Sequence, residues 1–249
     1  MNMDWTWFHK LGSPPHLYRT AGMLLPWFGW SALVLVLAGL YGGLWLAPPD
    51  QEMGDGFRII YVHVPAAWMS MAAYALVAGA AVVGLVWRMK AAELAARSAA
   101  PLGAMFTALT LATGSLWGKP MWGTWWEWDA RMTSELVLLF LYLGYIALHD
   151  AFPDRRTGAR ASAVLALVGV VNLPIIHYSV EWWHSLHQPA TVTRFGAPAI
   201  DVDMLVPLLV MAVGFTAWFA TALLLRLRVA LLETERGAAW VRSLRDAHG

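Results

Sequence analysis

Four tryptophans, two carboxylates and a guanidinium lie within ten residues of this chain, between two long apolar stretches. The segment runs from Trp122 to Arg131 and reads WGTWWEWDAR. Each indole is flat, apolar on its faces and carries one N–H donor. Four indoles can therefore form an amphipathic shelf where a membrane meets water. Such a shelf suits a flat hydrophobic ligand.

Histidines flank this segment in the sequence. His63 lies in IIYVHVP, where Pro65 suits the first turns of a helix and places His63 near the outer end of a span. His184 and His187 lie in EWWHSLHQ and would share a face if that stretch were helical. A histidine near a helix end is more often structural than a ligand, and the pair would equally serve as an interfacial anchor.

The chemistry open to these imidazoles depends on what else is available. Zinc would normally need further ligands, and the chain has no cysteine. Haem needs only one axial imidazole on each side of its ring. Arg58 and Arg131 could pair with its propionates in a bidentate fork. Alternatively, Arg131 pairs with nearby carboxylates and snorkels at the membrane boundary. Spacing alone does not separate these roles.

The elements that must position these residues are membrane spans. Hydrophobic residues make up 59% of the chain, charged residues 13%, and the mean hydropathy is +0.54. These values indicate an integral membrane protein. About 20 apolar residues cross the bilayer as a helix, and an open sheet would leave backbone groups unpaired in lipid. The sequence predicts an all-α polytopic protein, one membrane domain over 1–249, with spans near 22–46, 60–87, 101–117, 132–149, 161–181 and 204–226.

Basic residues are distributed unevenly among the connecting segments. Thirteen of the seventeen Lys and Arg residues fall on one side of the predicted spans. The positive-inside rule then predicts that both termini are cytoplasmic. Outer loops at about 47–59, 118–131 and 182–203 would face the periplasm of a bacterium, across its inner membrane. No basic block suggests a nucleic-acid partner, and the absence of cysteine excludes haem attachment through a C-x-x-C-H motif.

Three stretches together resemble a known family. Residues 117–144, 61–68 and 182–188 are similar to the WWD signature of haem-handling proteins, and specifically to the CcmC family of System I cytochrome c maturation. With the six predicted spans, the resemblance covers nearly the whole chain. It implies a haem-binding and transfer protein rather than an enzyme.

The resemblance also implies roles for individual residues. His63 and His187 would be the axial ligands of a non-covalently held haem b, whereas His184 falls outside the ligand position. Arg58 and Arg131 would lie near the haem edge. The platform would consist of Trp122, Trp125, Trp126, Trp128 and Asp129. One departure is Glu127, which stands where the family pattern has an apolar residue.

Partners follow from the same resemblance. Proteins of this family deliver haem to the periplasmic chaperone CcmE, beside CcmD and the CcmA/CcmB ABC transporter, in contact with membrane lipid. Two other classes of function remain open. A b-type electron-transfer cytochrome would hold haem between spans, with ligands well inside the apolar stretches, and a solute transporter would need no haem. A single-polypeptide haem synthase with a WWD segment would be larger, with more spans and more histidines.

Overall fold

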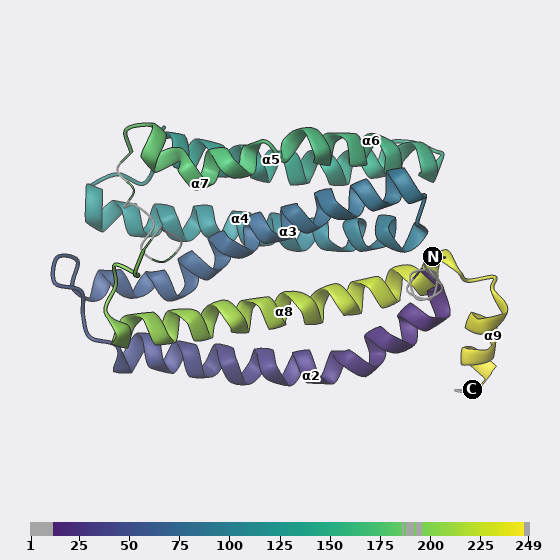
Figure 1. The fold of residues 1–249 in the computed structure, drawn as a ribbon, viewed down its shortest axis with the longest axis horizontal. Helices are drawn as coiled ribbons and strands as arrows, with labels where there is room; N and C mark the ends of the chain where they lie inside the picture. Colours follow the sequence, from purple (N-terminus) through teal and green to yellow (C-terminus); the bar gives the residue numbers. More distant parts are fainter. Residues whose placement is uncertain (1–11, 186, 188–191, 193–195, 247–249) are drawn as a thin grey trace, which may run out of the picture.

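A computed structural model describes residues 12–185, 187, 192 and 196–246 of the chain. Its long helices run side by side along one axis (Figure 1). Between the first two long helices, Gly42–Leu46 forms a π-helical turn and Asp55–Ile59 a 3-10 helix. The α-helices are α2 Pro14–Tyr41, α3 Ile60–Trp87, α4 Lys90–Trp122, α5 Ala130–Asp150, α6 Arg155–Gly169, α7 Asn172–Trp182, α8 Val202–Thr234 and α9 Ala239–Asp246.

Six apolar helical segments of the described chain are long enough to cross a membrane, which confirms the predicted all-α, six-span fold. They are Pro14–Leu46, Asp55–Trp87, Lys90–Trp122, Ala130–Asp150, Arg155–Trp182 and Val202–Thr234. Several contain 33 residues and measure about 50 Å at 1.5 Å per residue, against about 30 Å of hydrocarbon. The helices are longer than the predicted spans because their ends continue beyond the apolar layer.

Aspartates begin three of the helices. The side chains of Asp129, Asp154 and Asp201 accept hydrogen bonds from backbone N–H groups in the first turns of α5, α6 and α8. These caps satisfy N–H groups that have no partner inside the helix. Asp129 therefore closes the Trp-rich segment and opens α5 at the same time.

The fifth span is divided rather than merely kinked. The α-helix stops at Gly169 and resumes at Asn172, just before Pro174. The Asn172 side chain donates a hydrogen bond to the Ser134 carbonyl oxygen of α5, 2.9 Å away. This bond ties the start of α7 to the helix that follows the Trp-rich segment.

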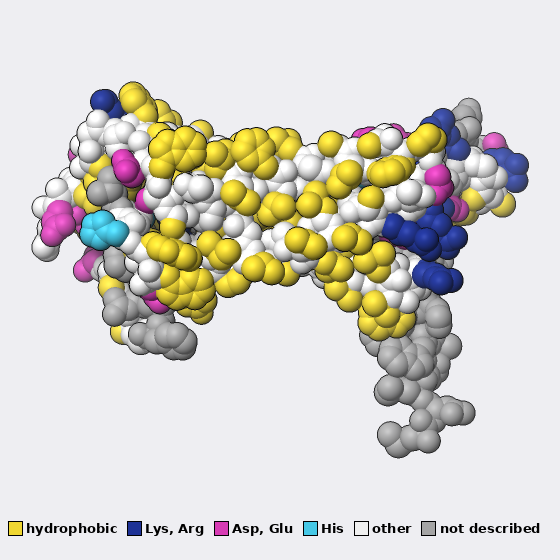
Figure 2. All heavy atoms as spheres, turned by 90° about the horizontal axis from the view of Figure 1, so that it is seen from above, with side chains coloured by type: hydrophobic (Ala, Val, Ile, Leu, Met, Phe, Trp, Pro, Cys, Tyr) yellow, Lys and Arg dark blue, Asp and Glu magenta, His cyan; other side chains and the backbone are white. Residues whose placement is uncertain are grey.

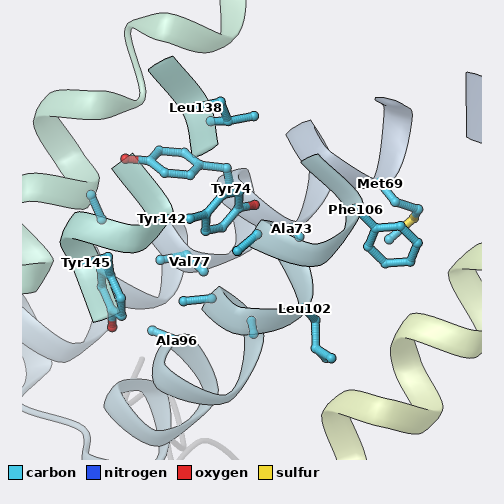
Figure 3. Packing of buried hydrophobic residues seen from close by; sticks show 14 of the residues in the cluster. Met69, Ala73, Tyr74, Val77, Ala96, Leu102, Phe106, Leu138, Tyr142 and Tyr145 are labelled. Carbon is cyan, nitrogen blue, oxygen red and sulfur yellow. The ribbon is translucent and has the colours of Figure 1, made fainter. Parts of the chain in front are cut away.

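The helices pack in three layers (Figure 1). α2 packs against α8, α8 also contacts α3 and α4, and α5 packs against α4, α6 and α7. The main core lies between α3, α4 and α5, where Tyr74 and Tyr142 are fully buried with ring centroids 5.1 Å apart (Figure 3). The Tyr142 hydroxyl donates to the Ser70 carbonyl oxygen at 2.7 Å. This core holds α3, α4 and α5 together.

The two ends of the molecule differ in charge. A band of hydrophobic side chains separates an end with acidic and histidine side chains from an end where Lys and Arg gather (Figure 2). α2 begins and α8 ends at the basic end (Figure 1). The Trp-rich segment between α4 and α5 lies at the opposite end, as its place between the third and fourth spans predicts.

Candidate functional site

A cavity of about 160 Å³ opens among the helices near the acidic end. Its walls come from α3, α4, α5, α7 and α8 and from the segment between α7 and α8. The residues with polar or aromatic side chains in its lining include His63, Trp68, Trp117, Trp122, Arg131, Glu135, His177 and His187. The structure therefore brings two of the predicted site histidines to one cavity, although 124 positions separate them in the sequence.

His63 lies in the first turn of α3 and is held by α4. Its Nδ1 is 2.9 Å from Oγ1 of Thr113. The single Thr113 hydroxyl proton is donated to the Leu109 carbonyl oxygen at 2.7 Å, so Oγ1 accepts from an Nδ1–H of His63. Gly114 leaves space for the ring, because a Cβ at that position would stand 3.2 Å from Cε1 of His63. Nε2 is left with a free lone pair, which is what a metal ligand needs.

His187 is oriented in the same way by a different group. Its Nδ1 lies 3.1 Å from Oδ2 of Asp129, which also accepts a hydrogen bond from the Ser185 hydroxyl. The other carboxylate oxygen, Oδ1, accepts from the Met132 N–H at 2.8 Å. An ionised carboxylate only accepts hydrogen bonds, so Nδ1 of His187 carries the proton and Nε2 is free. A metal-binding histidine commonly donates its other ring N–H to a carboxylate, which orients the imidazole.

The environment of Asp129 keeps it ionised. Burial by itself would raise its pKa, but hydrogen bonds from His187, Ser185 and the Met132 N–H outweigh burial and lower the pKa from 3.8 to about 2. Because the pKa of Asp129 is lower in the folded protein than its ordinary value, the ionised carboxylate stabilises the folded state at pH values above 3.8. This contribution is lost as the pH falls toward 2. Asp129 therefore supports His187 throughout the neutral and mildly acidic range.

Two indoles at the end of α4 connect the two histidines. Trp117 and Trp122 stack with centroids 6.5 Å apart. The ring of His63 lies 5.8 Å from that of Trp117, and the ring of His187 lies 5.2 Å from that of Trp122. Trp122 is one of the predicted platform residues, whereas Trp117 is an addition to them. Helical spacing did not indicate this pairing, because residues five apart lie about 140° apart around an α-helix.

The other predicted platform tryptophans lie farther out. Trp125 and Trp126, with Trp122, Asp129 and His187, line a small recess beside the main cavity. Trp128 is 74% exposed and meets Trp126 edge to face at 5.3 Å. The Trp-rich segment thus presents Trp125 and Trp128 to the outside, while the Asp129 carboxylate is buried.

The two predicted arginines occupy different positions. Arg131 lines the cavity, and its Nη1 donates to the Ile176 carbonyl oxygen of α7 at 2.8 Å. Arg58 is not part of the cavity lining: it donates to the Gly43 and Ala47 carbonyl oxygens and pairs with Asp55 at 2.9 Å. Arg131 is the better placed of the two to meet an anionic edge of a ligand.

Glu135 is a site residue that sequence reasoning missed. It is only 4% exposed and lines the cavity one turn beyond Arg131. Its Oε1 has no hydrogen-bond partner among the described residues. A carboxylate in the first turns of a predicted span was the available signal, because such residues usually face the interior of a bundle.

The remaining predicted residues lie in the loop after α7. α7 ends at Trp182, and neither His184 nor His187 lies in a helix, so the shared helix face considered from their spacing does not form. His184 is exposed and is not part of the cavity lining. Arg194 lies outside the described residues. Within those residues, no three His, Asp or Glu side chains gather as a metal-binding group.

Comparison with known proteins gives a consistent result. Residues 7–242 match the family model described as CcmC, Heme exporter protein C. The Heme exporter protein C of Escherichia coli is 52% identical over 240 residues, which is 96% of this chain and 97% of that protein. That of Haemophilus influenzae is 50% identical over 96% of this chain and 98% of its own length.

A more distant relative is a ccmC-like mitochondrial protein of Marchantia polymorpha named for cytochrome c biosynthesis. It is 42% identical over 181 residues, covering 73% of this chain and 76% of that protein. A family model that spans almost the whole sequence, together with half-identical relatives of matching length, decides the family. This multi-pass membrane protein belongs to the Heme exporter protein C (CcmC) family.

Proposed function

We propose that this protein binds haem b non-covalently at the acidic end of the bundle and transfers it to a haem chaperone during cytochrome c maturation. The observation that carries the proposal is the pair of imidazoles at one cavity, each with Nδ1 anchored and Nε2 free. Two axial imidazoles are a common ligand set for haem iron. The names of the relatives from Escherichia coli and Haemophilus influenzae support the choice of haem.

The lining of the cavity suits a porphyrin. Trp117 and Trp122 offer indole faces to a flat ring, and Arg131 supplies a cation for a propionate. The Nε1 atom of Trp117 is buried and has no hydrogen-bond partner among the described residues, so it is a further donor for such an edge. Indole contacts should contribute most of the affinity, at about 25 cal/mol per Å² of apolar surface buried.

The size of the cavity suggests presentation rather than storage. About 160 Å³ is below the roughly 300–1,000 Å³ typical of sites that enclose a drug-sized ligand. A porphyrin held here would insert one part and lie partly outside, against the exposed Trp125 and Trp128. An exposed edge is what a second protein would need in order to take the haem.

We infer which of the two histidines leaves the haem iron first from the groups that hold each of them in place. His63 is part of a helix and is braced by Thr113 of α4, whereas His187 lies outside regular secondary structure and depends on Asp129 and Ser185. Moving His187 requires no helix to move. We therefore propose that His187 is the ligand exchanged when the chaperone takes the haem.

The proposed setting follows from the family and the charge distribution. The chaperone is CcmE, and CcmD with the CcmA/CcmB transporter are the proposed partners in the inner membrane of a bacterium. The basic end, where α2 begins and α8 ends, would face the cytoplasm with both termini (Figure 2). A b-type electron-transfer cytochrome is less well supported, because its ligands would lie deep in the spans, whereas His187 lies outside them.

The proposal is tested with three single-histidine variants purified from haem-replete cells. His63→Ala and His187→Ala should each lose most of the Soret absorbance per protein, because each removes one iron ligand. His184→Ala is the matched control, since this histidine is exposed and not part of the cavity lining, and it should keep the wild-type spectrum. Equal Soret absorbance in all four proteins would contradict the assignment.

The transfer step needs a separate readout. Haem-loaded protein is mixed with purified apo-chaperone, and haem on each protein is followed by absorbance after separation. Wild-type protein should pass haem to the chaperone. Retention of all haem, even with the chaperone in excess, would contradict a transfer role while leaving haem binding intact.

A further inference from the structure

A second cavity, of about 320 Å³, lies at the opposite end of the molecule from the histidine site. It opens between the α3–α4 turn and the start of α6, with α5 and α8 at its sides. Six basic side chains take part in its lining: Arg88, Lys90, Arg97, Arg155, Arg156 and Arg160. Lys and Arg side chains gather at this end of the molecule (Figure 2).

Most of this positive charge is not neutralised within the described chain. Lys90 pairs with Glu235 at 2.6 Å and Arg97 with Asp150 at 3.4 Å. Arg88, Arg155, Arg156 and Arg160 form no ion pair with a described residue, and Glu93 is the only acidic side chain among the lining residues. Guanidinium groups bind phosphate oxygens through paired N–H donors. The cavity is therefore suited to a phosphate group.

The cavity lining also contains apolar side chains, among them Ala81, Leu85, Leu94 and Ala163. Val86 and Trp87, at the end of α3 next to Arg88, are 64% and 55% exposed. A tryptophan at the end of a span is typical of the boundary between hydrocarbon and headgroups. A ligand that combines a phosphate with hydrocarbon matches this mixed lining better than a soluble phosphate does.

Arg88 lies in the turn between α3 and α4, beside the cavity. Its φ of 54° is in the left-handed region, where a residue with a Cβ is strained and a glycine would not be. The turn from α3 to α4 thus carries a charged side chain at a position where glycine would cost less. That side chain belongs to the cavity lining.

We propose that this basic cavity binds the phosphate headgroup of an anionic phospholipid, with part of an acyl chain against the apolar residues below. Basic pockets between membrane helices are known to bind such headgroups. The site lies at the other end of the bundle from His63 and His187, so it does not depend on haem binding. Its role would be to hold α3, α4 and α6 together at the membrane surface.

The test measures lipid binding to the full-length protein by native mass spectrometry from detergent. Phosphatidylglycerol is titrated against wild-type protein, the pocket variant Arg156→Gln/Arg160→Gln and the control variant Arg236→Gln/Arg242→Gln. Arg236 and Arg242 are exposed near the same end and are not part of the cavity lining, so both variants lose two positive charges. The pocket variant should bind about tenfold or more weakly, and the control less than about twofold.

Further arms identify the source of the phosphate. Phosphatidylcholine should bind more weakly than phosphatidylglycerol, and inorganic phosphate should not raise the melting temperature in phosphatidylcholine nanodiscs. Equal losses in the pocket and control variants would overturn the site, because the effect would then be general surface charge. If inorganic phosphate raised the melting temperature as much as phosphatidylglycerol does, the lipid assignment would be overturned. Circular dichroism and thermal unfolding of each variant show whether the helices are intact.

Discussion

At the scale of single residues, the site depends on the protonation of two Nδ1 atoms. A neutral imidazole has one N–H and one lone pair, and a metal binds the lone pair. Thr113 and Asp129 both accept from Nδ1 and so leave Nε2 free on His63 and His187. These supporting residues should matter to haem affinity although neither is a proposed iron ligand.

Asp129→Asn separates the support of His187 from the helix cap. The amide oxygen can still accept from the Met132 N–H, but the NH₂ group then faces two donors, Ser185 and His187. His187 must either lose the bond or move its proton to Nε2, which cannot then bind iron. We expect haem affinity to fall about 10- to 100-fold in a haem titration. The matched control is Asp154→Asn, which alters the aspartate cap of α6 away from the cavity; an equal loss there would contradict the role of Asp129.

Thr113→Val tests the support of His63. Valine has nearly the shape of threonine but no acceptor, so Nδ1–H of His63 loses its partner. Haem affinity should fall about tenfold, and Thr113→Ser should restore it. Thr107→Val is the control on the same helix, because the buried Thr107 hydroxyl bonds only to the Gly103 carbonyl oxygen in the described structure. Unchanged affinity in Thr113→Val would show that another group orients His63.

At the scale of elements, close helix packing sets the position of the cavity walls. The rings of Tyr142 and Tyr74 occupy space where Gly103 of α4 and Gly169 of α6 have no side chain. A Cβ at either position would overlap a tyrosine ring or hydroxyl. Gly103 lets α4 approach α5, and Gly169 lets α6 approach α3, as small residues do in membrane bundles. The walls that carry Thr113, Arg131 and Glu135 are therefore held at a defined separation.

Gly103→Ala should destabilise the bundle. The added methyl group meets the ring of the buried Tyr142. The hydroxyl of Tyr142 donates to the Ser70 carbonyl oxygen, so the ring cannot move without losing this hydrogen bond. Overpacking of this kind costs about 1–3 kcal/mol. The melting temperature in detergent should fall clearly. Gly79→Ala is the control, because a Cβ at that helical position meets no heavy atom within 4 Å. Alanine also favours a helix more than glycine does, so a similar loss there would contradict the packing explanation.

At the scale of the whole molecule, the two ends have different chemistry. The acidic end carries the imidazole cavity and the exposed tryptophans, and the basic end carries the arginine-lined cavity. A hydrophobic band separates them (Figure 2). This polarity fits a protein that receives its orientation from basic residues and performs its binding function on the opposite face.

The orientation is testable because the chain has no cysteine. Glu52→Cys places a single thiol at the acidic end, and Arg236→Cys places one at the basic end; both positions are exposed. In intact spheroplasts, a membrane-impermeant maleimide should label the first variant and not the second. After lysis, both should be labelled. Labelling of the second variant alone before lysis would reverse the proposed topology.

Local patterns in the sequence determined the spans, the position of the Trp-rich segment and the early helical position of His63. Apolar length and proline placement act over neighbouring residues, so they can be read without a fold. Motif resemblance added the family and the proposed ligands. The break before Asn172 could not be predicted from the sequence, because periodicity does not distinguish a bent helix from an interrupted one.

Only the tertiary structure decided which groups support those ligands. Thr113 is 50 residues from His63, and Asp129 is 58 residues from His187. No local periodicity relates positions so far apart, since their contact depends on how α3, α4 and α5 pack. The same packing buried Glu135, added Trp117 to the cavity and left Arg58 bonded to the carbonyl oxygens of Gly43 and Ala47. Residue type set what each side chain could do, and packing set which partner it met.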